Sequence, residues 1–314
     1  MTLLKRFSTE CLYPKMAVRE LKLNLRPLIK KFEVYTKKNT MGDLTGSYVT
    51  AIKGRGLEFE GFRPYSINDD ASQIDWKASL RAQDTLVKKF VEERNLNVFF
   101  MFDVSNSMLF ASTDKLKAEY GAELVASMLF AILQAGDYAG LAMLSDKVVK
   151  VVPMMSGTRQ YYVLIKQLSN PDLYGGGFSF EAGLRFLIDY LTKRALVVIV
   201  SDFIGLKGDW EPHLSVASQK FDIMPIMIRD PHDTMLPEDV GQVVIQDPYS
   251  EEQIVIDSSA IRDEYEARAA EQVQGIRDSF KKRRLPLLEL YTDRSFVNPV
   301  VNFLKQRGNQ RGNK

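Results

Sequence analysis

The chain offers almost no sulfur or imidazole chemistry, because its 314 residues include only one cysteine, Cys11, and two histidines, His213 and His232. A single cysteine excludes an internal disulfide and a thiolate metal cluster, and it fits a reducing compartment. Two histidines argue against a zinc site rich in imidazole. A ligand-binding site in this chain is therefore expected to use oxygen atoms.

The sequence also lacks a long apolar run and a strong net charge. Its longest apolar runs, such as Ala195 to Val200, have the length of a strand and not the roughly 18 residues of a membrane helix. The first residues carry Lys5 and Arg6 and have no apolar core of a signal peptide. The formal net charge of +2 gives no argument for nucleic acid. We therefore expect a cytoplasmic protein that binds no nucleic acid.

Positive charge is concentrated at the N-terminus, where residues 1–40 hold ten Lys and Arg residues against three Glu residues. Apolar residues between Val18 and Phe32 recur at helical spacing, with Pro27 as a break. The pattern predicts a helix that packs on its own protein and has a solvated basic face. The alternative is peripheral contact of this face with anionic lipid or with an acidic partner.

Residues 42–95 have a different character, because glycines punctuate short apolar pieces and predict turns and short strands. Ile74 to Ala82 fits one or two helical turns, and Leu86 to Val91 fits a strand that leads toward the main sheet. The charged residues from Glu58 to Asp75 predict salt bridges that fix a turn, and Trp76 is expected in the core. We assign residues 1–95 to an N-terminal accessory segment of one helix and a small β layer.

Residues 96–306 alternate between apolar runs of strand length and longer amphipathic segments. This alternation predicts an α/β fold with a doubly wound, mostly parallel sheet and helices on both faces. The expected strands are Val98–Phe102, Ala139–Leu144, Val148–Val152, Leu196–Val200, Ile223–Ile228 and Pro286–Tyr291. The expected helices are Lys115–Ala135, Thr158–Leu168, Phe180–Leu191, Glu211–Lys220, Ser259–Lys282 and Ser295–Gln306.

Two further segments depart from this alternation. Residues 231–258 contain two short strands, Gln242–Gln246 and Gln253–Asp257, around the turn Asp247-Pro248-Tyr249-Ser250, which predicts an inserted β-hairpin. Residues 307–314 are Gly, Asn, Gln and basic residues, and we expect a disordered tail.

Polar residues follow two of the expected strands. Asp103, Ser105 and Ser107 come directly after the strand that ends at Phe102, and Asp202 follows the strand that ends at Val200. The ends of neighbouring parallel strands share one edge, where ligands of open α/β sheets bind, so Asp202 is expected to face the loop of Asp103. These carboxylates and hydroxyls are too few to enclose an ion completely. Such a partial set of oxygen ligands suits Mg²⁺, which keeps several water ligands when it binds to a protein.

This arrangement resembles the von Willebrand factor A domain and its metal-ion-dependent adhesion site. Asp103, Ser105 and Ser107 match the family's Asp-x-Ser-x-Ser element, and Asp202 matches its later Asp. The resemblance implies bound Mg²⁺, with Mn²⁺ or Ca²⁺ as alternatives.

The chain departs from that family at one ligand, a threonine that usually precedes a helix. Aligning the sequence on Gly183-Leu184 puts Phe178 at the threonine position, and Ser179 follows one residue late. Either the turn shifts so that Ser179 supplies the hydroxyl, or this ligand is missing. The loop residues that the resemblance places toward a partner are Asn106, Met108, Gly176, Gly177 and Phe178.

The flanking motifs are similar to the bacterial domain-of-unknown-function family number 58, over about Gly46 to Arg307. The motifs are Gly56-Leu57-Glu58-Phe59, Arg63-Pro64-Tyr65, Asn68-Asp69-Asp70, Ile74-Asp75-Trp76, Ile228-Arg229-Asp230-Pro231 and Leu290-Tyr291-Thr292-Asp293. Members of this family are commonly encoded beside MoxR-type AAA+ ATPases. The resemblance therefore implies a chaperone-like or assembly role.

Together these features predict a metal-ion-dependent protein-binding adaptor that acts with a MoxR-type AAA+ ATPase on a client protein. The chain has no phosphate-binding Gly-x-x-x-x-Gly-Lys-Ser/Thr loop of its own, so ATP hydrolysis would come from the partner. We assign no catalytic residue. The alternative is a Mg²⁺-dependent phosphohydrolase or phosphotransferase with Asp103 as nucleophile, although such enzymes carry a second carboxylate where this chain has Ser105.

Overall fold

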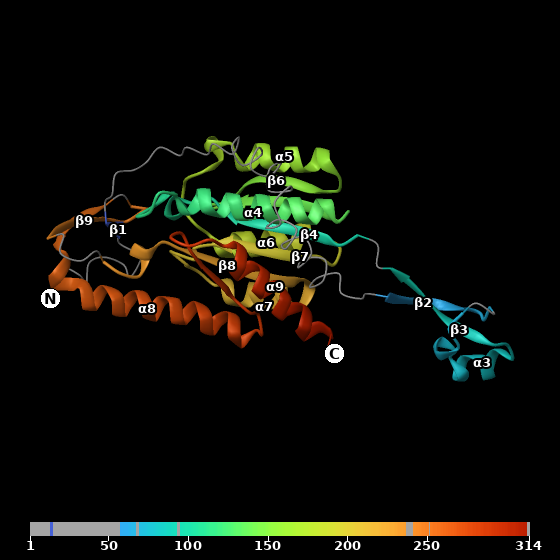
Figure 1. The fold of residues 1–314 in the computed structure, drawn as a ribbon. Coiled ribbons are helices and arrows are strands. Elements are labelled where there is room, and N and C mark those ends of the chain that lie inside the picture. The colour runs from blue at the N-terminus through green and yellow to red at the C-terminus, as the bar shows by residue number, and fades with distance from the viewer. Residues whose placement is uncertain are drawn as a thin grey trace.

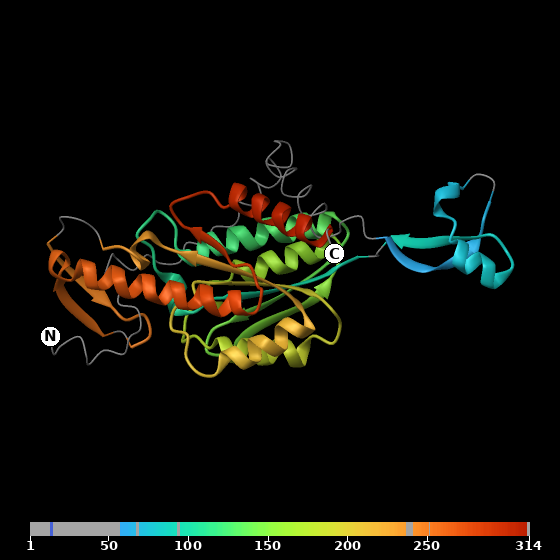
Figure 2. The same ribbon diagram turned by 90° about the horizontal axis from the view of Figure 1, so that it is seen from below.

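The structure is a computed structural model, and it describes residues 13–14, 57–66, 69–92, 95–236, 241–250 and 252–312. Most of these residues form an α/β domain, from which an arm made by the described residues between 57 and 92 extends in both views (Figures 1 and 2). The basic helix predicted between Val18 and Phe32 lies outside the described residues. No helix among the described residues is both long and apolar enough to cross a membrane.

A six-stranded, mostly parallel sheet forms the centre of the α/β domain. Its strands, in spatial order, are β11 (Leu288–Tyr291), β8 (Asp222–Arg229), β7 (Leu196–Ser201), β4 (Asn97–Asp103), β5 (Tyr138–Leu144) and β6 (Val148–Met155). Neighbours from β11 to β5 are parallel, and β6 is antiparallel. The chain leaves β4 through β5 and later returns to the other side of β4 as β7. The gap between the ends of β4 and β7 is therefore the topological switch point.

Helices cover both faces of the sheet (Figure 2). The helices whose buried residues join the core on one face are α4 (Lys117–Gln134), α5 (Thr158–Leu168) and α9 (Val297–Gly312). The helices on the opposite face are α6 (Phe180–Tyr190), α7 (Trp210–Lys220) and α8 (Ser258–Lys282). Short 3-10 turns occur at η4 (Asn106–Leu109), η5 (Pro171–Leu173) and η6 (Pro231–Asp233).

The central strands are continuous apolar runs because both of their faces are buried. In β4, Phe100 and Phe102 point into the core with α4, whereas Phe99 and Met101 point into the core with α6 and α7. All four side chains are at most 1% exposed. The predicted mixed α/β architecture is thus confirmed, and most helix and strand bounds differ from the predicted ones by only one to three residues.

A second, three-stranded sheet lies beside the α/β domain. Its strands are β9 (Gln242–Gln246) and β10 (Gln253–Asp257), which pair antiparallel, and β1 (Tyr13–Pro14), which pairs with the other edge of β9. The bounds of β9 and β10 are the predicted ones. The Asp247 carboxylate fixes the turn between them by accepting hydrogen bonds from the backbone N–H of Tyr249 and Ser250, at 2.7 and 3.2 Å.

The arm consists of β2 (Leu57–Pro64), β3 (Leu86–Glu92), η3 (Ala71–Gln73) and α3 (Trp76–Ala82). The strands β2 and β3 form a separate antiparallel pair, and the chain leaves β3 toward β4 of the main sheet. The predicted salt bridge that fixes the turn is present, since Arg63 makes two bonds of 2.5 and 2.6 Å to Asp69.

Two expectations for the outer parts of the chain are wrong. Trp76 is 67% exposed instead of buried, because the arm is too thin to enclose both faces of α3. The tail expected to be disordered from Arg307 is helical as far as Gly312, because Arg307 is nearly buried and its guanidinium bonds to the Ile223 carbonyl and to Asp222. Arg307, which belongs to a segment whose composition is typical of a disordered tail, therefore anchors the last helix.

The close packing of α6 on the sheet predicts the cost of one added methyl group. A Cβ at Gly183 would lie 2.5 Å from Leu144 Cδ2 and 2.7 Å from Met101 Sδ. We expect Gly183→Ala to lower the free energy of unfolding by about 1–3 kcal/mol in chemical denaturation. The control is Gly275→Ala in α8, where nothing lies within 4 Å of the new atom, and helix propensity should raise stability by up to about 1 kcal/mol. Equal effects at both positions would contradict the packing argument.

Candidate metal and partner-binding site at the carboxyl edge of the sheet

The structure brings Asp103 and Asp202 to the same edge of the sheet. The strands β4 and β7 are parallel neighbours in register at Phe102 and Val200, so Asp103 ends one strand and Asp202 follows the end of the other. Both side chains are at most 1% exposed. The two carboxylates therefore share a buried environment at the switch point of the sheet.

Both oxygen atoms of Asp103 are held by donors from its own surroundings. Oδ1 accepts a hydrogen bond of 2.9 Å from the Ser105 N–H, and Oδ2 accepts one of 2.5 Å from the Ser201 hydroxyl. Burial, and secondly the charge of Asp202, nevertheless raise the pKa of Asp103 to about 7. The two hydrogen bonds lower this pKa but do not compensate for the missing counter-charge.

A chain of oxygen atoms connects the predicted ligands. The hydroxyls of Ser105 and Ser107 lie 3.1 Å apart, and the Ser107 hydroxyl donates to Asp202 Oδ1 at 3.1 Å. The same Asp202 oxygen accepts a bond of 2.9 Å from the Ile204 N–H. The side chains of Ser105, Ser107 and Asp202 are fully buried. The side-chain oxygens of Ser105, Ser107 and Asp202, which were predicted as ligands from the sequence, therefore lie close together.

A buried lysine that sequence analysis missed holds the second carboxylate. Lys117, in the first turn of α4, places Nζ 2.8 Å from Asp202 Oδ2 and 3.0 Å from Asp233 Oδ2, and all three side chains have no exposed area. Burial alone would lower the pKa of Lys117, but Asp202 and Asp233 outweigh it and the pKa is raised. Lys117 occupies a position on the apolar side of the helical pattern of α4. A charged residue at such a position was the sequence signal that could have predicted a buried ion pair.

The wider cluster at this edge carries more negative than positive charge. Asp230, also buried, accepts bonds from the Ser112 N–H and hydroxyl and from the Thr292 hydroxyl. Arg229 is 1% exposed and its three guanidinium nitrogens make no hydrogen bond to the described residues, although its charge acts on Asp233. The four carboxylates of residues 103, 202, 230 and 233 outnumber Lys117 and Arg229, which leaves a formal charge of −2 when all six groups are ionised.

This donor set fits a divalent cation in its chemistry. Carboxylate and hydroxyl oxygens are the ligands that Mg²⁺ prefers, and the excess charge of the buried cluster is the charge that such an ion would neutralise. Among the described residues, no group of three or more His, Cys, Asp and Glu side chains is arranged to hold a metal. A cation here would therefore depend on Asp103 and Asp202 together with Ser105 and Ser107.

The fifth predicted ligand, Ser179, has another role. Its hydroxyl accepts a hydrogen bond of 3.2 Å from the Ala182 N–H and so caps the start of α6. Phe178, at the position of the family's threonine, stacks on Phe180 at a centroid distance of 6.4 Å and belongs to the edge of the core. Neither residue provides an oxygen to the cluster around Asp103.

The residues predicted to face a partner are only partly suited to that task. Asn106 joins the two loops, because its backbone N–H donates to the Gly176 carbonyl and its Oδ1 accepts from the Gly176 N–H, at 3.0 and 2.9 Å. Gly177 lies next to Asp146 at the same edge. Met108 is fully buried in the core beneath the loop, so its predicted contact with a partner is wrong.

The turn between β9 and β10 covers this site. The Asn106 Nδ2 donates to the Pro248 carbonyl, and the Tyr249 hydroxyl donates to the Ile204 carbonyl, each at 3.0 Å. The ring of Tyr249 occupies the space beside Gly205, where a Cβ would approach it to 2.7 Å. Burial raises the pKa of Tyr249, and the charges of Asp202 and Asp103 raise it further.

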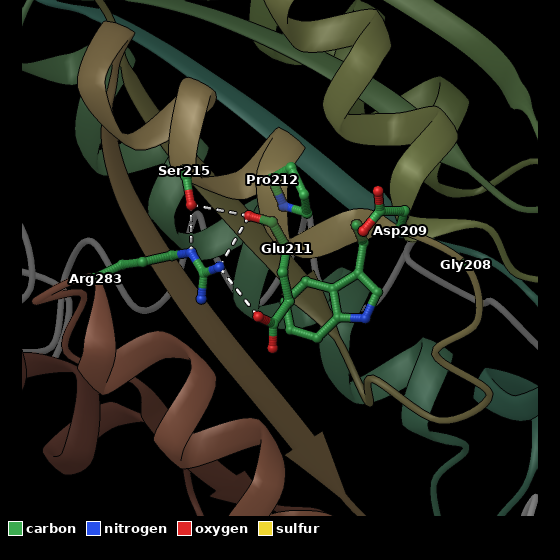
Figure 3. A pocket seen from close by; sticks show the side chains of 7 residues that line it. Gly208, Asp209, Glu211, Pro212, Ser215 and Arg283 are labelled. Carbon is green, nitrogen blue, oxygen red and sulfur yellow. Dashed lines mark hydrogen bonds and ion pairs between the residues drawn. The ribbon is translucent and has the colours of Figure 1, made fainter.

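A separate polar pocket lies at the start of α7 (Figure 3). Its lining residues are Gly208, Asp209, Trp210, Glu211, Pro212, Ser215 and Arg283. Arg283 donates to the Ser215 hydroxyl at 2.8 Å and to Glu211 Oε2 at 3.3 Å, and Glu211 also accepts from Ser279. Because Arg283 and Glu211 pair with each other, we assign no ligand to this pocket.

The position of Lys117 predicts a large loss of stability on its removal. In Lys117→Met the carboxylates of Asp202 and Asp233 would remain buried without their shared cation, so the free energy of unfolding should fall by about 3–5 kcal/mol. The control is Lys115→Met, which breaks an exposed pair with Glu123 and should cost less than about 1 kcal/mol. A loss at Lys117 as small as that at Lys115 would show that the buried pair is not needed.

The raised pKa of Asp103 predicts stability that depends on pH. Between the ordinary value of 3.8 and about 7, the folded protein keeps a proton that the unfolded chain releases, so stability falls as pH rises and then levels off. The shift corresponds to at most about 4 kcal/mol. Asp103→Asn, which imitates the protonated group, should flatten the curve measured by thermal unfolding between pH 4 and 8. If the stability of Asp103→Asn changes with pH in parallel with that of the wild type, the pH dependence comes from other groups.

Comparison with known proteins gives a family but no activity. The family described as protein of unknown function DUF58 matches residues 61–275. The uncharacterized protein Rv1480 of Mycobacterium tuberculosis is 27% identical over 290 residues, which cover 90% of each chain. The uncharacterized protein YeaD of Bacillus subtilis is 28% identical over 107 residues, which cover 34% of this chain and 25% of YeaD.

Among solved structures, the conserved hypothetical protein BatB from Bacteroides thetaiotaomicron matches with a TM-score of 0.44 and 14% identity, over 70% of this chain and all of BatB. A similarity of that size carries no argument about function. The family match, in contrast, spans more than half of the sequence. This chain therefore belongs to the DUF58 family of proteins of unknown function.

Proposed function

We propose that this protein is a protein-binding adaptor of the von Willebrand factor A type, and that its partner binds at the carboxyl edge of the sheet. One observation carries the proposal: the oxygens of Asp103, Ser105, Ser107 and Asp202 converge at the switch point between β4 and β7. In open α/β sheets this is the position where ligands bind.

The proposal includes a divalent cation held by these four side chains. When bound, Mg²⁺ would supply an open coordination position for an acidic side chain of the partner. The chain's own residues prepare this position. Ser201 and the Ser105 N–H orient Asp103, and Lys117 neutralises one oxygen of Asp202 while the other oxygen stays directed at Ser107.

Access to the proposed site requires the turn at Tyr249 to withdraw. Two hydrogen bonds hold the turn in place, from Asn106 to Pro248 and from Tyr249 to Ile204. Each bond contributes about 1 kcal/mol net, so the loss of both is small compared with the energy of a protein interface. The turn is thus a cover that a partner can displace.

We propose a MoxR-type AAA+ ATPase as the partner, acting on a client protein whose identity stays open. The support is the family similarity together with the absence of a phosphate-binding loop in this sequence. An enzyme that uses Asp103 as nucleophile is the alternative. The feature that disfavours it is Ser105, which stands where such enzymes carry a second carboxylate.

Cation binding can be tested on the chain alone. We expect Mn²⁺ or Mg²⁺ to raise the melting temperature at pH 8, since ligand at 100 times its Kd stabilises a protein by about 2.7 kcal/mol. Asp103→Asn should lose this shift, and Asp172→Asn, on an exposed turn, should keep it. The metal part of the proposal fails if wild type and Asp103→Asn respond alike.

Partner binding cannot be tested by removing Mg²⁺ with a chelator, because an AAA+ ATPase itself requires Mg²⁺ to bind and hydrolyse ATP. Affinity for the ATPase should therefore be compared between variants at constant Mg²⁺. We expect Asp103→Asn to weaken binding at least tenfold and Tyr249→Ala, which removes the cover, to strengthen it about tenfold. Tyr162→Ala, an exposed tyrosine on α5, serves as the control and should leave the affinity unchanged. Unchanged affinity in both site variants would reject the proposed interface.

A further inference from the structure

The arm carries two large apolar side chains that are exposed to solvent and not packed in its core. Trp76 and Leu80, one helical turn apart on α3, are 67% and 81% exposed. Lys77 and Arg81 follow them directly, are exposed, and form no ion pair with the described residues. We call these four residues the α3 face.

The opposite side of α3 is fastened firmly to the arm. The Ser79 hydroxyl accepts a hydrogen bond of 2.9 Å from the Leu86 N–H of β3. Asp75 caps α3 by accepting from the N–H groups of Lys77 and Ala78, and its other oxygen lies 3.3 Å from Lys88 Nζ. These contacts fix the rotation of α3, so the exposure of the α3 face is a consequence of how the helix is held.

No described part of the α/β domain covers the α3 face. Figures 1 and 2 both show the arm extending away from the main sheet and its helices. Tryptophan and arginine are residue types that often contribute much of the binding energy of a protein interface, and the α3 face carries one of each. The arm thus presents a small binding surface at a distance from the core.

We infer that the α3 face docks an acidic amphipathic segment of a partner protein. The segment would place an apolar side chain on Trp76 and Leu80 and carboxylates against Lys77 and Arg81, which form no ion pair with the described residues. Asp70 and Asp84, close to α3 in sequence, are also exposed, so the arm carries charge of both signs. This mixture fits a protein surface better than an anionic membrane, which attracts only positive charge. The inference does not rest on the site around Asp103.

The surface is too small for a tight complex on its own. Stable interfaces bury at least about 1,000 Å² in total, and two large side chains with their neighbours provide only part of that area. We therefore expect dissociation constants in the micromolar range or weaker for an isolated segment, and a larger contribution where the same partner also binds elsewhere.

Intrinsic fluorescence provides a direct test, because the chain has two tryptophans and the other, Trp210, is only 9% exposed. The spectrum of Trp76 is obtained as the difference between wild type and Trp76→Phe. The probe is an amphipathic helical peptide of about 18 residues, with Leu at positions i, i+3, i+4 and i+7 and Glu elsewhere. We expect a blue shift of Trp76 on adding this peptide and none with the same peptide carrying Lys for Glu.

Two variants separate docking from general charge attraction. The double variant Lys77→Glu with Arg81→Glu should weaken binding of the acidic peptide at least tenfold. The double control Lys166→Glu with Lys193→Glu, at exposed positions of the α/β domain, changes the net charge by the same amount and should change binding less than twofold. Equal losses in both would show that only the net charge of the chain matters and would overturn the inference.

The same measurement identifies every other occupant. A Trp76 spectrum that is already blue in dilute protein would mean that the chain covers its own α3 face. A blue shift that grows with protein concentration alone would indicate a second copy. A shift with vesicles of anionic lipid but not with the acidic peptide would indicate a membrane. Each of these results, or no shift with any probe, overturns the proposal.

Discussion

The ammonium group of Lys117 between Asp202 and Asp233 is the interaction on which the carboxyl edge depends. It connects the start of α4 with the residue after β7 and with η6 after β8, all without access to water. A buried ion pair is weak evidence for high stability, because desolvation offsets much of the attraction. The ion pairs instead fix the relative positions of α4, the end of β7 and η6, because all three meet at the Lys117 ammonium.

This constraint determines the state of the two aspartates at the switch point. Lys117 neutralises Asp202 and leaves Asp103 with hydroxyl and amide donors only, so the two carboxylates have different surroundings although they share one edge. The site is therefore asymmetric: Asp202 has its cation within the chain, whereas Asp103 lacks one. An added cation would act chiefly on Asp103.

The sequence predicts the fold well wherever local pattern decides the structure. The run from Val98 to Phe102 became β4 because both faces of the strand are buried, and the hairpin around Asp247-Pro248 has the predicted bounds because turn residues separate two short strands. Pairing between distant segments was not predictable in this way. The two residues of β1 pair with β9, and β3 pairs with β2 and not with the main sheet, although neither pairing leaves a periodic signal.

The same distinction applies to the site. The convergence of Asp103 and Asp202 follows from strand order, which the alternation of elements predicts. Lys117 and Asp202 are 85 residues apart, and Tyr249 reaches the site from an inserted hairpin, so their roles depend on tertiary contacts that no local pattern records. The Ser179 hydroxyl caps α6, and its role as a metal ligand stays a prediction, because a helix cap and a metal ligand require the same residue type at almost the same position.

The way α8 is attached has a consequence for the hairpin that precedes it. β10 ends at Asp257, whose carboxylate caps α8, so hairpin and helix form one continuous piece. Apart from Ser258, the buried residues of α8 lie between Val273 and Phe280, toward its far end. At 1.5 Å per residue, the half of α8 nearer the hairpin extends about 20 Å from this anchor, and the Tyr265 hydroxyl ties it to η6 by donating to the His232 carbonyl at 2.8 Å. Because hairpin and helix are continuous, a rotation of α8 about its buried end would move the Tyr249 turn only if the bonds from Tyr265 to His232, from Tyr249 to Ile204 and from Asn106 to Pro248 break together.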